Sequence, residues 1–145
     1  NFSFCWYQFY KLLFIYTNRM RNALFDLESL TIGLVVLLNT MGNKSFKVKD
    51  LNMKHWTKLA QGADDVGVNA MSISDITGIP RPTVVRKIKI LIEDNFLHIN
   101  EKKLITLNIK GSTLKKFTNL QNKNMKNLSN FLYRIFNQIK ITNTN

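Results

Sequence analysis

The sequence predicts a mainly α-helical protein with a small β-hairpin. Apolar residues recur at spacings of three and four over most of the chain, which is the period of an amphipathic helix. They alternate with polar residues mainly between positions 96 and 108, which is the period of a strand. The chain has 145 residues, of which 45% are hydrophobic and 21% charged. This length and composition are typical of one folded domain with its own core.

The first predicted helix runs to about residue 21 and is apolar on all sides. Eight of the first 16 residues are aromatic, and at helical spacing they point in every direction. A segment of this kind must be covered all round, and one small domain offers too little surface to do so. We therefore expect residues 1–25 to form a dimerisation helix, with Trp6, Phe9 and Leu13 at the interface.

A core helix is predicted at 27–41, where leucines recur at helical spacing. Asp26 can cap its N-terminus, and Gly42 stands just beyond its end. The insert at 43–68 has a mixed pattern. Its alternation at 46–48 predicts a short strand, and its apolar spacing then predicts a helix over 52–62.

The last predicted helix covers 111–140 and is amphipathic, with a regular apolar stripe in its second half. Together with the aromatic start, this stripe gives more apolar surface than one small domain can cover, so we expect a homodimer. The residues expected on the C-terminal side of its interface are Leu128, Leu132, Ile135 and Ile139.

The most informative segment is 69–91, which predicts two helices joined by a tight turn. Gly78 allows the positive φ that a sharp bend needs. Pro80 and Pro82 fall in the first turn of the second helix, where their missing N–H groups cost nothing. The residues expected to line the seam between the helices are Ile73, Ser74, Ile79, Val84, Ile88, Leu91 and Ile92.

A helix stop and a hairpin are predicted directly after this pair. Asn95 stands where a helix commonly ends in the left-handed conformation. Residues 96–99 and 104–108 alternate between apolar and polar around a polar tip at 100–103. This pattern is typical of a β-hairpin.

The run from 69 to 108 resembles the winged helix-turn-helix domains of bacterial regulators, and TGIPRPTVVRKIKIL in particular resembles the turn and second helix of IclR-type regulators. The layout of the chain resembles the MarR family: an N-terminal helix, a core helix (LTIGLVVLL), the two-helix motif, a wing ending in LITLNIKGSTL and a long C-terminal helix. The resemblance implies a single winged-helix domain over 1–145, flanked by N- and C-terminal dimerisation helices. It also implies a dimeric transcriptional regulator that binds double-stranded DNA. Lys87 and Thr77 depart from the pattern, because both are polar where an apolar residue is usual.

The resemblance places the outward side of the second helix in the major groove of DNA. The candidate DNA contacts on that helix and on the hairpin tip are Arg81, Thr83, Val85, Arg86, Lys89, Lys102 and Lys103. An arginine can bind guanine or phosphate through two hydrogen bonds. We expect Arg81 and Thr83, in the first turn, to select bases and the later residues to hold phosphates.

The charge of the chain agrees with a polyanionic partner. It has 21 Lys and Arg against 9 Asp and Glu, a net charge of +12, and the last 35 residues contain no acid. Such a balance attracts nucleic acid. A Lys-rich and Asn-rich composition with solvated surface charges is the alternative explanation.

We expect no enzymatic activity, no cofactor and no metal site. The segment 62–67 has glycines near phosphate-loop spacing, but Val68 and Asn69 stand where Lys and Ser or Thr are required. The histidines and Cys5 have no nearby ligand partners in the sequence. A single cysteine favours a reducing compartment, and the apolar start falls short of the about 20 residues that span a bilayer. We therefore expect a cytoplasmic protein with no membrane partner.

Two alternatives remain open. A winged helix can serve protein assembly, with the aromatic start docking a partner, or it can bind repeated DNA sites in replication or partition. Any small-molecule effector is expected in a pocket between the aromatic helix and the two-helix motif, lined by Trp6, Tyr10 and Trp56. A plain hydrophobic interface is the alternative there.

Overall fold

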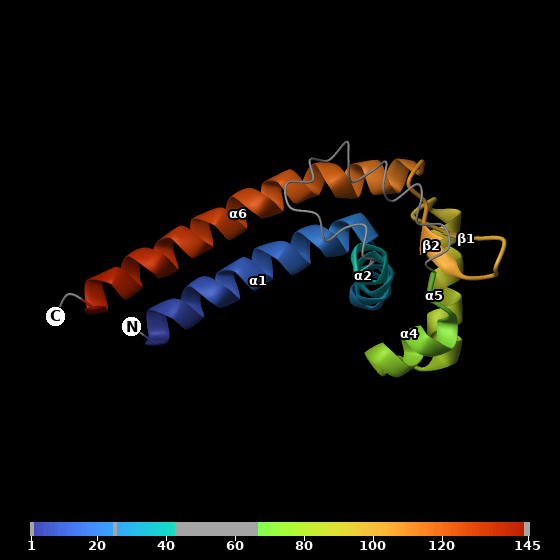
Figure 1. Ribbon diagram of the computed structural model, residues 1–145, viewed down its shortest axis with the longest axis horizontal. Coiled ribbons are helices and arrows are strands. Elements are labelled where there is room, and N and C mark those ends of the chain that lie inside the picture. The colour runs from blue at the N-terminus through green and yellow to red at the C-terminus, as the bar shows by residue number, and fades with distance from the viewer. Residues whose placement is uncertain (1, 25, 43–66, 144–145) are drawn as a thin grey trace. The chain divides into compact units, whose positions relative to one another are not determined.

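The computed structural model describes residues 2–24, 26–42 and 67–143 of the protein (Figure 1). The chain is mainly helical with a small two-stranded antiparallel sheet, as the sequence predicts. Its contacts divide it into two compact units. Leu24–Lys115 form one, here called the core unit, and Asn1–Ala23 with Lys116–Asn145 form the other, here called the helix pair. The predicted strand at 46–48 and helix at 52–62 lie outside the described residues.

Helix α2 (Leu27–Met41) forms as predicted, with both of its predicted caps. The Oδ1 atom of Asp26 accepts a hydrogen bond from the Ser29 amide at 2.8 Å, which satisfies one of the free N–H groups of the first turn. The Gly42 amide donates to the Leu38 carbonyl at 2.7 Å and closes the other end. The buried side of α2 contacts α4, α5 and β2, so this helix lies at the centre of the core unit.

Helices α4 (Ala70–Thr77) and α5 (Arg81–Glu93) are joined by a three-residue turn. Asn69 caps α4 through its side chain, and Gly78 ends it with a φ of 71°, which a glycine adopts without steric cost. Pro80 is the N-cap of α5 and lies one residue before the predicted first turn, whereas Pro82 lies within that turn. Four of the predicted seam residues are buried, with Ile73 and Val84 fully enclosed. The other three, Ser74, Ile79 and Ile92, are partly exposed.

The sheet consists of β1 (Leu97–Ile99) and β2 (Ile105–Leu107), paired antiparallel with His98 opposite Thr106. Val68 adds an isolated bridge to Ile105, with N–H to carbonyl distances of 3.1 and 2.9 Å. Gly67 lies so close to this sheet that a Cβ atom would stand 2.3 Å from that of Leu104. The chain before α4 therefore adds a third segment to the sheet, which the sequence did not reveal.

The end of α5 turns sharply into the hairpin. Asn95 has a φ of 59°, as its predicted role as helix stop requires, and the Phe96 amide donates to the Leu91 carbonyl at 2.9 Å. Phe96 is fully buried. The residues that form the core of this unit with it are Ile32, Val36, Ile73, Val84, Ile88, Leu91, Leu97, Ile105 and Leu107.

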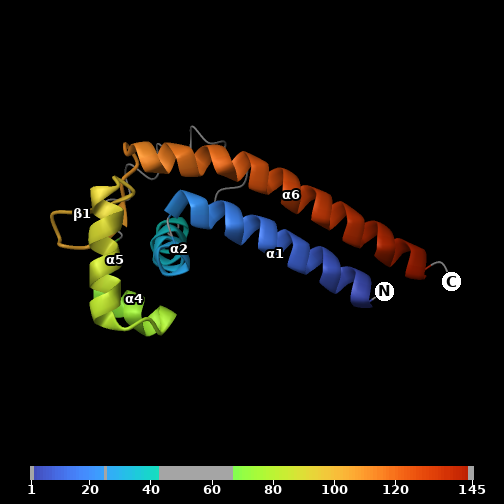
Figure 2. The same cartoon turned by 180° about the vertical axis from the view of Figure 1, so that it is seen from behind.

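The helix pair consists of α1 (Phe2–Leu24) and the larger part of α6 (Ser112–Asn143). The two helices run side by side and antiparallel (Figures 1 and 2). Polar contacts fix this alignment: Arg134 donates to Gln8 at 3.3 Å, and Arg19 donates to Asn124 at 2.8 Å. Both helices run a few residues beyond their predicted ends, because neither contains a glycine or proline that would stop it.

Candidate nucleic-acid interface

The exposed surface of α5 carries positive charge. Arg81, Arg86 and Lys89 are exposed on this helix, and Val85 is 38% exposed. The helix contains no acidic residue before Glu93 at its end. Thr83 is only partly exposed, because it lies on the flank of the helix between the outward and the buried sides. The exposed surface of α5 is therefore that of an elongated, basic ridge.

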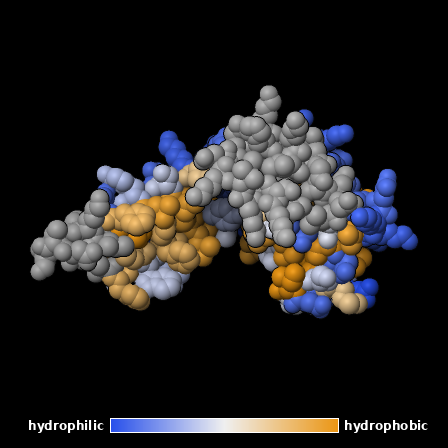
Figure 3. All heavy atoms as spheres, viewed as in Figure 1, coloured by the Kyte–Doolittle hydropathy of each residue, from blue (hydrophilic) through white to orange (hydrophobic). Residues whose placement is uncertain are grey.

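The tip of the hairpin projects past α5 on the side away from α2 in both ribbon views (Figures 1 and 2). It carries Lys102 and Lys103, both exposed. The Oδ1 atom of Asn100 accepts a hydrogen bond from the Leu104 amide at 2.9 Å, and the Lys103 amide donates to the Asn100 carbonyl at the same distance. The tip is therefore a defined turn that exposes two lysines near the cations of α5. Figure 3 shows hydrophilic residues gathered along this edge.

The turn between α4 and α5 is held by side-chain hydrogen bonds. The Ser74 hydroxyl donates to the Ile79 carbonyl at 2.7 Å, and the Ile79 amide donates to the Thr77 hydroxyl at 3.2 Å. Thr77 in turn donates to the Ile73 carbonyl at 2.7 Å. The polar residue at position 77 therefore fixes the turn that sets the start of α5.

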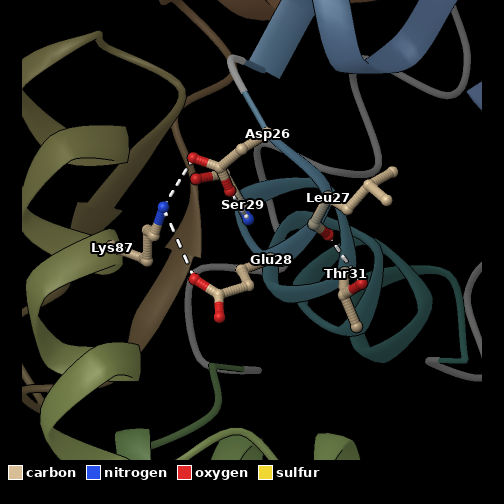
Figure 4. Close-up of polar contacts among 6 residues, drawn as sticks. All are labelled: Asp26, Leu27, Glu28, Ser29, Thr31 and Lys87. Carbon is tan, nitrogen blue, oxygen red and sulfur yellow. Dashed lines mark hydrogen bonds and ion pairs between the residues drawn. The ribbon is translucent and has the colours of Figure 1, made fainter. Parts of the chain in front are cut away.

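Lys87 is a charged residue at a seam position where an apolar residue was expected, and its contacts account for it. Its side chain is only 11% exposed, and its ammonium lies 2.6 Å from Oδ2 of Asp26 and 3.5 Å from Oε2 of Glu28 (Figure 4). Both carboxylates belong to the start of α2, where negative charge also meets the positive end of the helix dipole. An ion pair thus connects α5 to α2 at a seam position where an apolar residue is usual. Local sequence patterns do not reveal this ion pair, because Lys87 and Asp26 lie 61 positions apart.

The charge on Asp26 is stabilised by this arrangement. Burial raises the pKa of the Asp26 carboxyl, but hydrogen bonds from Lys87 and Ser29, together with the charge of Lys87, outweigh burial and lower that pKa below its usual value. The side chain therefore does two things in its ionised form: it caps α2 and binds α5.

The helix pair exposes an apolar face that includes several of the predicted interface residues. We define the apolar face as eight side chains that are each 39–77% exposed: Phe2, Trp6, Phe9, Leu13, Met125, Leu128, Leu132 and Phe136. Within each helix they recur at spacings of three and four, so they lie on one side of it. Ile135 is half-buried next to this face, and the side chain of Ile139 lies outside those described.

The two halves of the apolar face adjoin. A hollow lined by Cys5, Trp6, Phe9, Phe131 and Ile135 joins the apolar sides of α1 and α6. Trp6 also contacts three aromatic neighbours, at ring-centre distances of 5.8 Å for Phe2, 5.7 Å for Phe9 and 5.3 Å for Tyr10. The apolar face is therefore a continuous surface across both helices.

The hollow that contains Trp6 differs from the predicted effector pocket. Its lining comes from α1 and α6 alone, and neither Tyr10 nor any residue of α4 or α5 takes part. Tyr10 is 59% exposed. The predicted pocket between the aromatic helix and the two-helix motif stays a prediction. Trp56 lies outside the described residues.

No family model, curated protein or solved structure matches this chain. Within residues 2–24, 26–42 and 67–143, no group of three His, Cys, Asp or Glu side chains is placed to hold a metal ion. Over the same residues, no single helix is both long and apolar enough to cross a membrane. Helices α1 and α2 meet that test only as a pair.

Proposed function

We propose that the core unit is a winged helix-turn-helix domain that binds double-stranded DNA sequence-specifically, and that the protein is a dimeric transcriptional regulator. One observation carries this proposal: α5 exposes three cations and no acid before Glu93, and the hairpin tip exposes two further lysines. Such a surface is complementary to the phosphate backbone of a duplex.

The size of α5 suits the major groove. A helix with its side chains is about 10–12 Å wide, and the groove is about 12 Å wide. Arg81 stands at the first position of the helix, so it is the side chain expected to reach base edges. Arg86 and Lys89 follow one and two turns later, where the phosphate backbone flanks the groove. The hairpin tip with Lys102 and Lys103 would lie along the neighbouring backbone.

We propose that the second copy of this chain covers the apolar face of the helix pair. Eight exposed apolar side chains on one surface exceed what a monomer usually leaves in water. The exposed cations Lys11, Lys123, Lys126 and Arg134 lie off this face, so two copies could meet there without bringing like charges together. A two-fold dimer implies two half-sites about 34 Å apart on one side of the duplex.

The test begins with selection of preferred duplexes from a random-sequence pool, followed by competition binding on the selected and a scrambled duplex at two salt concentrations. Arg81→Ala should weaken the selected duplex by about 1–3 kcal/mol and relax base preference at one position. Lys102→Ala should weaken both duplexes alike and lower the salt slope by about one. Lys126→Ala, an exposed lysine on α6, serves as the control for the loss of one charge.

The outcomes separate the competing functions. Equal losses on both duplexes for Arg81→Ala would reduce its role to a phosphate contact. Unchanged binding for Arg81→Ala, Arg86→Ala and Lys102→Ala would refute DNA binding by this surface.

A winged helix that serves protein assembly is the second candidate, favoured by the exposed aromatics of the apolar face. Its partner binding should be nearly independent of salt. A replication or partition protein would bind DNA through the same residues, and the selected sites would then occur as repeats.

A further inference from the structure

A second hollow lies between α1 and α6, on a different side of the helix pair from the apolar face. Its volume is about 180 Å³. Lys11 lines it, and Lys11 follows Phe9 of the apolar face by two residues, which is about 200° around the helix. The hollow therefore stays open when the apolar face is covered by a second copy.

The lining of this hollow has an apolar and a polar part. The apolar part, here called the floor, consists of Leu12, Ile15 and Phe131. The polar part, here called the rim, consists of Gln8, Lys11, Asn127, Asn130 and Arg134. A concave site with an apolar base and a few converging polar groups is the usual form of a small-molecule site.

The rim has positive charge that nothing in the helix pair neutralises. The sequence contains no Asp or Glu in either 1–23 or 116–145. Arg134 donates a hydrogen bond to the Oε1 atom of Gln8 at 3.3 Å, so its charge meets only a neutral amide. Gln8 is 93% buried, and its oxygen accepts from Arg134 while its NH₂ group is a donor. The rim therefore offers two cations and the NH₂ donors of three side-chain amides, beside the carbonyl oxygens of those amides.

We propose that this hollow binds a small organic anion, with its carboxylate between Lys11 and Arg134 and a short apolar body on the floor. The guanidinium of Arg134 suits a carboxylate because it presents paired donors. At about 30 Å³ per water molecule, the volume holds about six waters, which is room for a chain of about five or six carbons. The site is independent of the proposed DNA-binding surface.

The test uses the full chain and three probes at constant ionic strength: hexanoate, hexanamide and inorganic phosphate. Isothermal titration with hexanoate should show saturable binding of one molecule per chain. Hexanamide lacks the charge and phosphate lacks the apolar body, so each should bind at least about tenfold more weakly. Amide chemical shifts should move around Leu12 and Phe131.

The variants Arg134→Gln and Lys11→Gln should each weaken hexanoate by about tenfold. Lys126→Gln removes the same charge from α6 outside the hollow and should leave the affinity within about twofold, since an exposed charge contributes little. Lys11 is exposed and makes no ion pair among the described residues, so its variant tests the site even if Arg134→Gln disturbs the helix pair.

Three results would overturn the proposal. Hexanoate binding that does not saturate would show general association with apolar surface. Equal affinity for hexanamide would remove the role of the cations. An equal loss in Lys126→Gln and Lys11→Gln would show attraction by net charge alone.

Discussion

The ion pair between Lys87 and Asp26 predicts an asymmetry between its two partners that can be measured. The perturbations are Asp26→Asn, Lys87→Met and the double variant. Asparagine caps a helix about as well as aspartate, so Asp26→Asn removes the charge while keeping the hydrogen bond to the Ser29 amide. Methionine has a similar length to lysine and suits a buried seam position.

The exposures of the partners set the expected magnitudes. Lys87→Met leaves Asp26 and Glu28 with side chains 38% and 48% exposed, which water can solvate. Lys87→Met should lower the free energy of unfolding by less than about 1 kcal/mol, because an apolar residue often replaces a buried ion without lowering stability. Asp26→Asn leaves an ammonium that is only 11% exposed, with Glu28 at 3.5 Å as its remaining ionic partner. Since Asp26 is itself partly exposed and Glu28 remains, we expect a cost of about 1–2 kcal/mol, less than for breaking a fully buried pair.

The double variant should be about as stable as Lys87→Met alone, which gives a coupling free energy of about 1–2 kcal/mol. Urea unfolding followed by far-UV circular dichroism measures all four proteins, at one protein concentration because dimerisation would contribute to stability. If Asp26→Asn costs as much in the Lys87→Met background as in the native chain, the two side chains are not coupled. A larger cost for Lys87→Met than for Asp26→Asn would refute the argument from exposure.

Three further predictions concern pH, backbone fit and assembly. Because the pKa of Asp26 is lowered on folding, its ionised form stabilises the protein fully above the unfolded value of about 3.9. This contribution is lost as the pH falls through the lower folded pKa, so the difference in unfolding free energy between the native chain and Asp26→Asn should vanish in acid. Gly111→Ala should destabilise more than Gly78→Ala when both are unfolded in urea. The first would place a Cβ atom 1.7 Å from the Asn95 carbonyl oxygen, whereas the second meets no atom within 4 Å and costs about 1–2 kcal/mol for its positive φ. Leu132→Lys should yield a monomer in sedimentation at micromolar concentration, while Tyr133→Lys, its exposed neighbour off the apolar face, should not; a monomeric native chain would contradict the dimer itself.

The features that the sequence predicted correctly depend on short-range chemistry. Asp26 caps the helix that begins at the next residue, Gly78 directly follows α4, and Asn95 takes a positive φ two residues after the end of α5. The hairpin strands follow from alternation over a few residues around the turn at 100–103. In each case the residues that interact lie within about one or two turns of chain, so a local pattern contains the information.

The features that it missed depend on residues far apart in the chain. In the sequence, Lys87 is a charged residue at an apolar seam position. Only the fold brings the carboxylates of Asp26 and Glu28 beside it. Val68 joins the sheet as a single bridged residue, which is too short for any alternation to show. The hollow with Lys11 and Arg134 exists only once α1 and α6 are aligned antiparallel. Periodicity reveals which side of an element is buried, but not what it is buried against.

The buried amides of the helix pair have a consequence for its register. Asn124 is 7% exposed, accepts from Arg19 at 2.8 Å and donates to the sulfur of Met20 at 3.3 Å, while Gln8 accepts from Arg134 at 3.3 Å. Sliding α1 along α6 by one turn, about 5.4 Å, would let many apolar side chains find new neighbours at small cost. The same slip would separate both amides from their partners, at about 1–3 kcal/mol for each buried group left unsatisfied. The polar residues therefore select one alignment among several that the aromatic residues alone would accept. Asn124→Leu would remove one of these two constraints and leave the one at Gln8.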